Sequence, residues 1–224
     1  TGPASVYEGR FGFFRSHVQS DSIDLGAITE GLCESWELLN IASRPFPCGH
    51  YIQPYIDAAL ELQRRECVPV DEIAAVECPM PGYMIPLVCE PRDEKLRPKT
   101  SWHARYSLPH CMAEALTTGG LSKHSFDPVT LEDGRFAALA ATVRGVAAEA
   151  EEPRTQWSGA ARFTLRDGSQ LRHRIDHLRG TPENPMSESD IVDKFRRNAE
   201  GALTPVAIDH AVETLLTLET CADI

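Results

Sequence analysis

The sequence predicts an α+β fold, with helical segments at both ends of the chain and a mixed α/β region between them. Two alternating runs joined by Asp167-Gly168 predict a β-hairpin across residues 162 to 175, because this dipeptide accepts the positive φ of a tight turn. Apolar residues at 3.6-residue spacing after Gly49 predict an amphipathic helix. Beyond residue 186 only helical patterns follow, which indicates a helical tail.

The first half of the chain combines helices, turns and one strand. Residues 23 to 33 allow a short helix, and residues 35 to 43 are richer in β-formers. The amphipathic helix begins near His50 and runs for about four turns, because Pro54 is tolerated only in its first turn. Residues 71 to 79 alternate enough between apolar and polar side chains to form a strand.

The second half adds further helices around the hairpin. Residues 101 to 120 predict a helix that paired glycines end, and residues 127 to 143 predict another. In the tail, Ser187 begins a capping pattern, and Thr204 is the expected N-cap of the last helix with Pro205 at its first position. These signals predict two tail helices.

The composition is that of a folded protein and argues against two classes of partner. Of the 224 residues, 42% are hydrophobic and 25% are charged, close to the averages for globular proteins. The net charge of −11 opposes non-specific binding to nucleic acid, and no apolar stretch approaches the ~18 residues of a bilayer span. We therefore predict no nucleic-acid partner and no membrane partner.

The seven cysteines are scattered and form no CxxC pair, which suits reduced thiols in a cytoplasm. We therefore expect a cytoplasmic protein. The chain opens with Thr1 and has no cationic leader before an apolar stretch. We expect that the protein was processed or trimmed, or that an N-terminal segment is missing.

Five stretches occur in an order that resembles the C-terminal half of a known family. From first to last they read EGRFGFF, RPFPCGHYIQPYIDAALEL, ARYSLPHCMAEALTTG, FTLRDG and RGTPENPMSESDIVDKFRRNA. Together they closely resemble the MmgE/PrpD family over nearly the whole chain. The resemblance implies an all-helical domain with an inserted α/β lid. Residues 1 to 42 would end the first helical block, residues 43 to 178 would form the lid, and residues 179 to 224 would return to the helical domain.

The resemblance also implies an activity. Family members include 2-methylcitrate dehydratase, cis-aconitate decarboxylase and an iminodisuccinate epimerase, which act without metal or redox cofactor. They are considerably longer than this chain, and their N-terminal half supplies an Asp and His residues of the site. We therefore expect a homodimer and a missing N-terminal half or partner chain. We also expect residues 187 to 217 to pack against residues 1 to 35.

The stretch at the start of the implied lid carries three candidate site residues. Arg44 stands where the family usually has the lysine of a K-P-[FY]-P motif; its guanidinium can clamp a carboxylate but does not give up a proton. Gln53 stands where the family often has histidine, and His50 lies one turn earlier, so both can face an anion at the helix N-terminus. Solvated capping residues are the alternative interpretation.

A second part of the implied site surrounds His110, which stands where many relatives have tyrosine in S-x-x-Y. An imidazole can transfer protons near neutral pH, although a structural histidine is the alternative. In the cation-rich run from residue 92 to 105 we expect only Arg105 to bind substrate, and Lys95 to lie on the loop surface. The predicted site has His110 and His50 as catalytic residues and Arg44, Gln53 and Arg105 as substrate-binding residues. We expect these five side chains to converge on one cleft.

Two functions from different classes remain open. The first is a cofactor-independent dehydratase, decarboxylase or isomerase acting on a short-chain di- or tricarboxylate. The second is a non-catalytic binding or assembly subunit, or a relic of the same family, which the departures at Arg44, Gln53 and His110 favour. We predict no metal site, because Cys48 and His50 lack a second pair of ligands, and we expect Cys48 to pack under the hinge.

Overall fold

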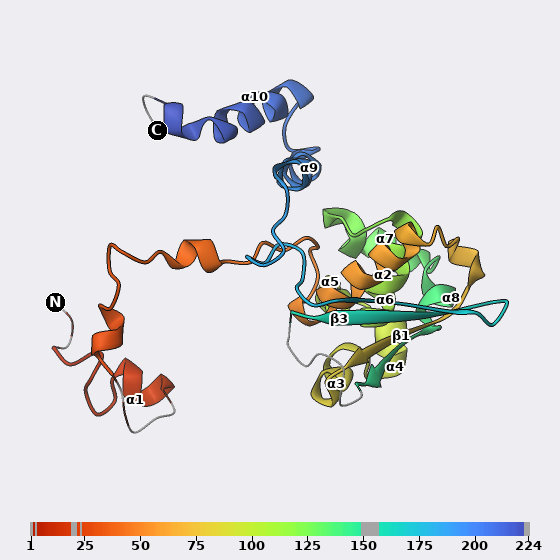
Figure 1. The fold of residues 1–224 in the computed structure, drawn as a ribbon, viewed down its shortest axis with the longest axis horizontal. Coiled ribbons are helices and arrows are strands. Elements are labelled where there is room, and N and C mark those ends of the chain that lie inside the picture. Colours follow the sequence, from red (N-terminus) through yellow and green to blue (C-terminus); the bar gives the residue numbers. More distant parts are fainter. Residues whose placement is uncertain (1, 3, 19–21, 23, 149–156, 222–224) are drawn as a thin grey trace. The chain divides into compact units, whose positions relative to one another are not determined.

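The chain forms two compact units, residues 1–40 and residues 41–224 (Figure 1). The computed structural model describes residues 2, 4–18, 22, 24–148 and 157–221. None of the helices in these ranges has the length and apolar character that a membrane crossing requires. The expected packing of residues 187 to 217 against residues 1 to 35 concerns both units and stays a prediction, as does the division at residues 42 and 178.

The first unit consists of short helical turns. Helix α1 spans Phe13–His17, and 3-10 turns span Gly26–Ile28 and Glu37–Asn40. The expected β character of residues 35 to 43 is wrong, because the backbone closes a local turn there, with the Leu39 N–H donating to the Trp36 carbonyl. Several large apolar side chains of this unit are exposed, from 68% for Trp36 to 88% for Phe11.

A four-stranded mixed sheet, in the order β2-β1-β3-β4, lies at the centre of the second unit (Figure 1). The strands are β1 (Ile73–Met80), β2 (Val143–Ala147), β3 (Gly159–Leu165) and β4 (Gln170–Ile175). β1 pairs in parallel with β2 and antiparallel with β3, which pairs antiparallel with β4. The predicted strand and the predicted hairpin are confirmed, and Gly168 in the hairpin turn has a φ of +85°.

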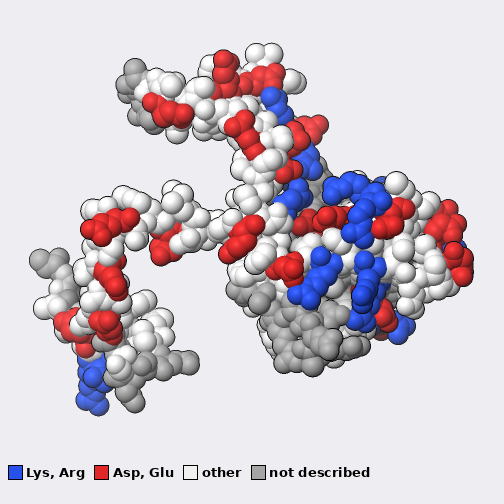
Figure 2. Space-filling model, in the orientation of Figure 1, with Lys and Arg blue, Asp and Glu red and all other residues white. Residues whose placement is uncertain are grey.

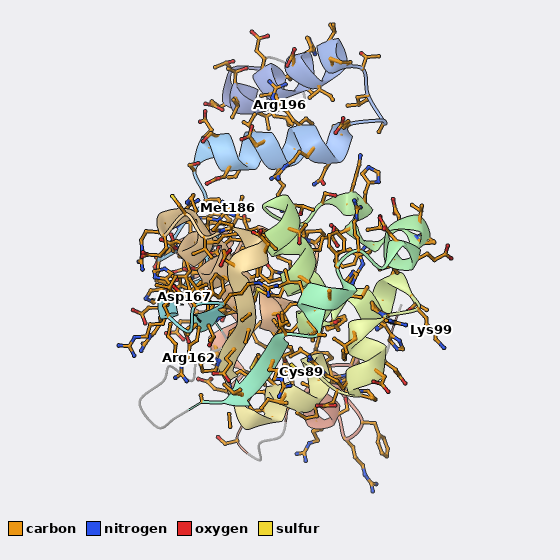
Figure 3. All side chains as sticks on the ribbon, turned by 90° about the vertical axis from the view of Figure 1, so that its right-hand side faces the viewer. Cys89, Lys99, Arg162, Asp167, Met186 and Arg196 are labelled. Carbon is orange, nitrogen blue, oxygen red and sulfur yellow. The ribbon has the colours of Figure 1, made fainter. Side chains whose placement is uncertain are left out.

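The two faces of the sheet differ in character. Val76 of β1 and Phe163 of β3 are register partners, and both are fully buried. The next row, Glu77, Arg162 and Arg172, points to the opposite face, because successive side chains of a strand alternate. Figure 2 shows Lys and Arg side chains gathered on the α/β part of the second unit. Figure 3 shows Arg162 on the side of the sheet away from the helices.

Two helices cover the apolar face of the sheet. Helix α2 (Gln53–Arg65) packs against β3 and β4, and α6 (Leu108–Thr118) packs against α2 and β2. The predicted amphipathic helix is confirmed: a 3-10 turn begins at His50, and Pro54 lies in the first turn of α2. Ile56 and Leu62 on its apolar stripe are fully buried, so the stripe forms part of the core.

Short helices surround α6. They are α3 (Ile85–Val88), α4 (Arg92–Leu96), α5 (Ser101–Arg105), α7 (Pro128–Asp133) and α8 (Ala137–Ala140). The helix predicted across residues 101 to 120 is two helices, because the Ser107 side chain caps α6 at the His110 N–H. The single helix predicted across residues 127 to 143 is also wrong. Gly134, at φ +67°, ends α7, and β2 begins at Val143.

The expectation that Lys95 lies on the loop surface is wrong as well. Lys95 is only 8% exposed, and its Nζ donates hydrogen bonds of 2.8 Å to the carbonyl oxygens of Leu87 and Tyr106. Burial lowers the pKa of this lysine, and neighbouring groups partly oppose that shift. Its ammonium therefore joins the end of α3 to the end of α5 inside the protein.

The tail contains helices α9 (Glu188–Ala199) and α10 (Pro205–Leu216). Both predicted caps are confirmed: Ser187 forms a capping box with Asp190, and the Thr204 side chain accepts from the Ala207 N–H. Arg196 of α9 bonds to Asp209 of α10, and Figure 3 shows it between the two helices.

Arg179 connects this tail to α2. Its guanidinium forms ion pairs with Asp57 of α2 at 3.5 Å and with Asp190 of α9 at 3.0 Å, and it lies over the ring of Phe46. Burial raises the pKa of Asp57, and the nearby Arg179 charge limits that rise. Arg179 thus connects the start of α9 to α2 through one carboxylate on each helix.

Candidate functional site

The hinge loop, residues 44–49, is fixed at several points before α2 begins. The Arg105 Nη1 donates to the Pro47 carbonyl at 2.8 Å, and the Gly49 N–H donates back to the Arg105 carbonyl at 2.7 Å. A Cβ on Gly49 would lie 2.9 Å from the Tyr106 ring, so only glycine allows this close approach. The loop is therefore held against the end of α5.

Arg44 and His50 meet at one end of this loop. The Arg44 Nη2 lies 3.4 Å from the His50 Nδ1, and the His50 ring stacks edge-to-face on Trp157 with centroids 4.7 Å apart. Both residues line a cavity of ≈170 Å³ with Tyr51, Tyr106 and Trp157. This volume is below the roughly 300 Å³ at which small-molecule pockets begin, so it suits one acidic group of a ligand.

The protonation state of His50 follows from its surroundings. Burial, and then the positive charge of Arg44, lower the pKa of His50 below its ordinary value of 6.5. Arg44 has only N–H donors, so the Nδ1 atom of His50 accepts in this pair. The His50 ring is therefore neutral at neutral pH, with a lone pair on Nδ1 beside a permanent positive charge.

Two other predicted site residues hold the loop in place. Gln53 is fully buried, and its Nε2 donates to the Cys48 carbonyl at 3.1 Å. Arg105 holds the Pro47 carbonyl, and its guanidinium lies 4.7 Å above the Phe126 ring. Cys48 itself is a buried free thiol. The predicted substrate contacts of Gln53 and Arg105 stay predictions; in this structure their side chains bond to the loop backbone.

His110 lies in a different cavity. It is 5% exposed and lines a hollow of ≈540 Å³ with Arg97, Lys99, Ser101 and Phe136 among its neighbours. The expected convergence of all five side chains on one cleft is therefore wrong. His110 is on the first turn of α6, from which its ring points toward Phe136, with ring centroids 6.3 Å apart.

The His110 ring is paired with a second buried titratable group. Its Nε2 lies 3.7 Å from the Glu114 Oε2, too long for a hydrogen bond. Burial lowers the pKa of His110 and raises the pKa of Glu114, so burial disfavours the charged form of each. Burial therefore opposes the formation of an ion pair between the two side chains.

Sequence patterns alone do not reveal three of the residues around Arg44. Trp157 comes just before β3 and far along the chain from His50, so only the folded sheet brings them together. Tyr51 follows His50 and Tyr106 follows Arg105 in the sequence, and this adjacency is the one sequence feature that could have indicated them. Among the described residues, no group of three or more His, Cys, Asp or Glu side chains is arranged to hold a metal ion.

Comparison with family models supports the resemblance noted in the sequence. The model described as the MmgE/PrpD C-terminal domain matches residues 46–218, most of the chain. The chain belongs to the MmgE/PrpD family. A comparison with curated proteins gives no match.

The MmgE/PrpD match covers four of the five predicted site residues. The helices and the four-stranded mixed sheet of this chain are consistent with an MmgE/PrpD C-terminal domain. The family contains dehydratases and other lyases. His50, Gln53, Arg105 and His110 fall inside the matched region, whereas Arg44 lies just before it. The position of Arg44 in the site therefore rests on its contact with His50.

Proposed function

We propose that this chain is the C-terminal half of a cofactor-independent MmgE/PrpD lyase that acts on a short-chain di- or tricarboxylate. The observation that carries the proposal is the contact between the Arg44 guanidinium and a neutral His50 in one cavity. A permanent cation beside a proton acceptor is what abstraction of a proton next to a carboxylate requires.

In the proposed reaction Arg44 binds a substrate carboxylate. A carboxylate that engages this guanidinium competes with the 3.4 Å contact to His50 and frees the Nδ1 lone pair. His50 then takes the proton from the carbon next to that carboxylate, and the C–H electron pair forms a double bond. The β-hydroxyl leaves as water after taking a proton from a second acid, which the proposal assigns to the partner half.

The other predicted residues have supporting places in this scheme. Arg105 and Gln53 keep the hinge loop in position through the carbonyls of Pro47 and Cys48. His110 is a second candidate for proton transfer, through the cavity that it lines with Arg97 and Lys99. Dehydration needs a proton donor at the leaving hydroxyl, whereas decarboxylation and isomerisation need one at carbon, so the choice among them depends on where the second acid lies.

The test is calorimetric titration of the chain, together with any co-purifying half, with cis-aconitate. Arg44→Met should weaken binding by about 2 kcal/mol or more, because a charge-assisted contact in a partly dry site is lost. Arg172→Met, which removes the same charge from the exposed face of β4, away from both cavities, is the matched control and should change binding little. Equal small effects of both substitutions would refute the clamp.

A non-catalytic assembly subunit is the second candidate function. It is favoured by the separation of His110 from the cavity of Arg44 and His50. The intact mass of the purified material, together with a search for a second polypeptide, separates the candidates. A partner half that restores turnover supports the lyase; no partner and no polycarboxylate binding support the assembly subunit.

A further inference from the structure

A second cavity lies on the other side of Arg44, between the hinge loop, the turn at residues 121–123 and helix α9. Its volume is ≈220 Å³, and Pro45, Phe46 and Pro47 form its apolar wall. Four cationic side chains line it: Arg44, Lys123, Lys194 and Arg197. No carboxylate side chain among the described residues lines it. We call it the four-cation cavity.

This concentration of charge is unusual in so acidic a chain. The net charge is −11, yet two of the four lysines face one small cavity. Within the described ranges, none of the four cations forms an ion pair with a carboxylate. Like charges gathered in one cavity repel each other, and a bound anion would offset that repulsion.

The cations are held in place by backbone carbonyl groups. The Lys194 Nζ donates to the Arg44 carbonyl at 2.7 Å. The Lys123 Nζ donates to the carbonyls of Asn198, at 3.0 Å, and Glu200 at the end of α9. Each ammonium has three N–H donors, of which Lys194 uses one and Lys123 uses two in these bonds. Carbonyl groups carry no net charge, so the positive charge of each lysine is not neutralised. The ammonium groups are therefore oriented and still able to bind an anion.

From these observations we propose that the four-cation cavity binds a phosphate group. A tetrahedral dianion accepts hydrogen bonds from several directions, and these cations converge from the hinge loop, the turn and α9. Lysine ammonium groups bind phosphate as point charges and arginine forks bind it bidentately, so both kinds of cation in this cavity suit a phosphate group. The Ser122 and Asn198 side chains at the wall are further polar groups for the ligand.

This site is separate from the proposed lyase site but shares Arg44 with it. Arg44 lines both the four-cation cavity and the cavity of His50 and Trp157. Phosphate that draws the guanidinium toward Lys194 weakens its contact with the His50 Nδ1. Phosphate binding therefore raises the pKa of His50, since the Arg44 charge is one cause of its depression.

The test is titration of the full chain with inorganic phosphate, followed by calorimetry and by the ³¹P NMR shift. We expect a dissociation constant of about 1 mM or tighter. Lys194→Gln and Arg197→Gln should each weaken binding about tenfold or more, because each removes a charge-assisted contact. Arg172→Gln removes the same charge from the exposed face of β4, outside the four-cation cavity, and should leave phosphate binding unchanged.

Three further measurements make the result decisive. Unchanged far-UV circular dichroism and thermal midpoints show that the variants are folded. Glycerol 3-phosphate in place of inorganic phosphate distinguishes a phosphomonoester from free phosphate, and tighter binding of either supports the site. No phosphate binding, equal losses in Arg172→Gln, or tighter binding of citrate with the same dependence on Lys194 would overturn the proposal. Because these readouts need no turnover, they stand independently of the lyase activity.

Discussion

The backbone N–H of Ser43 donates a 2.7 Å hydrogen bond to the carbonyl oxygen of Gly180. Ser43 precedes the hinge loop, and Gly180 follows the end of β4. The segment that enters the α/β region therefore runs beside the segment that leaves it. The Gly180 N–H in turn donates to the Asn184 carbonyl at 2.7 Å, which closes the turn before α9.

Gly180→Ala should destabilise the protein strongly. The backbone has a φ of +98° there, and an added Cβ would lie 2.0 Å from the Ser43 carbonyl oxygen. Positive φ costs an alanine about 1–2 kcal/mol, and the clash adds to it, so we expect a total loss of about 3 kcal/mol in the free energy of unfolding. Urea unfolding measures this loss.

Gly168→Ala is the matched control for that substitution. Gly168 also has a positive φ, +85°, but no atom lies within 4 Å of the position that an added Cβ would take. We expect a loss of only about 1 kcal/mol there. Equal losses at both positions would show that the Ser43 segment does not lie against Gly180 in solution.

Lys95→Met should also be destabilising. The substitution leaves the Leu87 and Tyr106 carbonyls without their donor, and unsatisfied buried acceptors cost about 1–3 kcal/mol each. We expect a loss of about 2–4 kcal/mol in the free energy of unfolding. Lys99→Met, on the exposed neighbouring loop, should change stability by about 0.5 kcal/mol or less. Chemical denaturation of the two variants side by side tests both statements.

Glu114→Gln should stabilise the protein above neutral pH. Burial raises the pKa of Glu114 above 4.5, while a Ser125 hydrogen bond and Arg135 partly oppose this. The folded chain thus holds this proton more tightly than the unfolded chain. Its contribution to stability is full below pH 4.5 and is lost as the pH rises through the raised pKa. A neutral glutamine avoids that loss, and we expect a gain of about 1 kcal/mol near pH 8.

The pH dependence separates this cause from a simple packing effect. As the pH falls through the raised pKa toward 4.5 the advantage of Glu114→Gln should shrink, since the wild-type carboxyl becomes protonated first in the folded state and then in the unfolded state. His110 contributes in the opposite sense. Burial lowers the pKa of His110, so its contribution to stability is full above pH 6.5 and is lost as the pH falls through the lowered pKa. A constant difference at every pH would rule out the titration of Glu114 as the cause.

We expect the chain to associate with itself or with a partner half. Large apolar side chains are exposed on α10, including Val206 at 79% and Leu215 at 54%. Trp36 and Phe11 of the first unit are exposed as well. Contiguous exposed apolar surface marks interfaces. Light scattering at micromolar concentration should show a dimer or larger assembly, and a clean monomer would contradict this.

Local patterns were sufficient to predict much of the fold. The 3.6-residue spacing of α2, the Asp167-Gly168 turn and the caps at Ser187 and Thr204 are each encoded within a few residues. β2 was missed because a short strand that pairs in parallel carries no turn signal of its own, and its partner β1 lies far earlier in the chain.

The candidate site was less predictable for a physical reason. The resemblance to the family motif indicated Arg44 and His50, and in the structure these two side chains lie in contact. Which way a side chain points from the first turn of a helix depends on packing, so Gln53 turned back to the Cys48 carbonyl and His110 turned toward Phe136. The role of Lys95 depended on carbonyl groups from two other helices, which no local pattern encodes.

The order of strands in the sheet affects how the chain folds during its synthesis. β1 is central, but both of its neighbours, β2 and β3, come much later in the sequence. During synthesis from the N-terminus, Val76 and Met80 therefore emerge long before the strands and helices that bury them. The newly made chain exposes β1 without either neighbour until β2 has left the ribosome, and with one open edge until β3 follows, which makes this interval the point of greatest risk for aggregation.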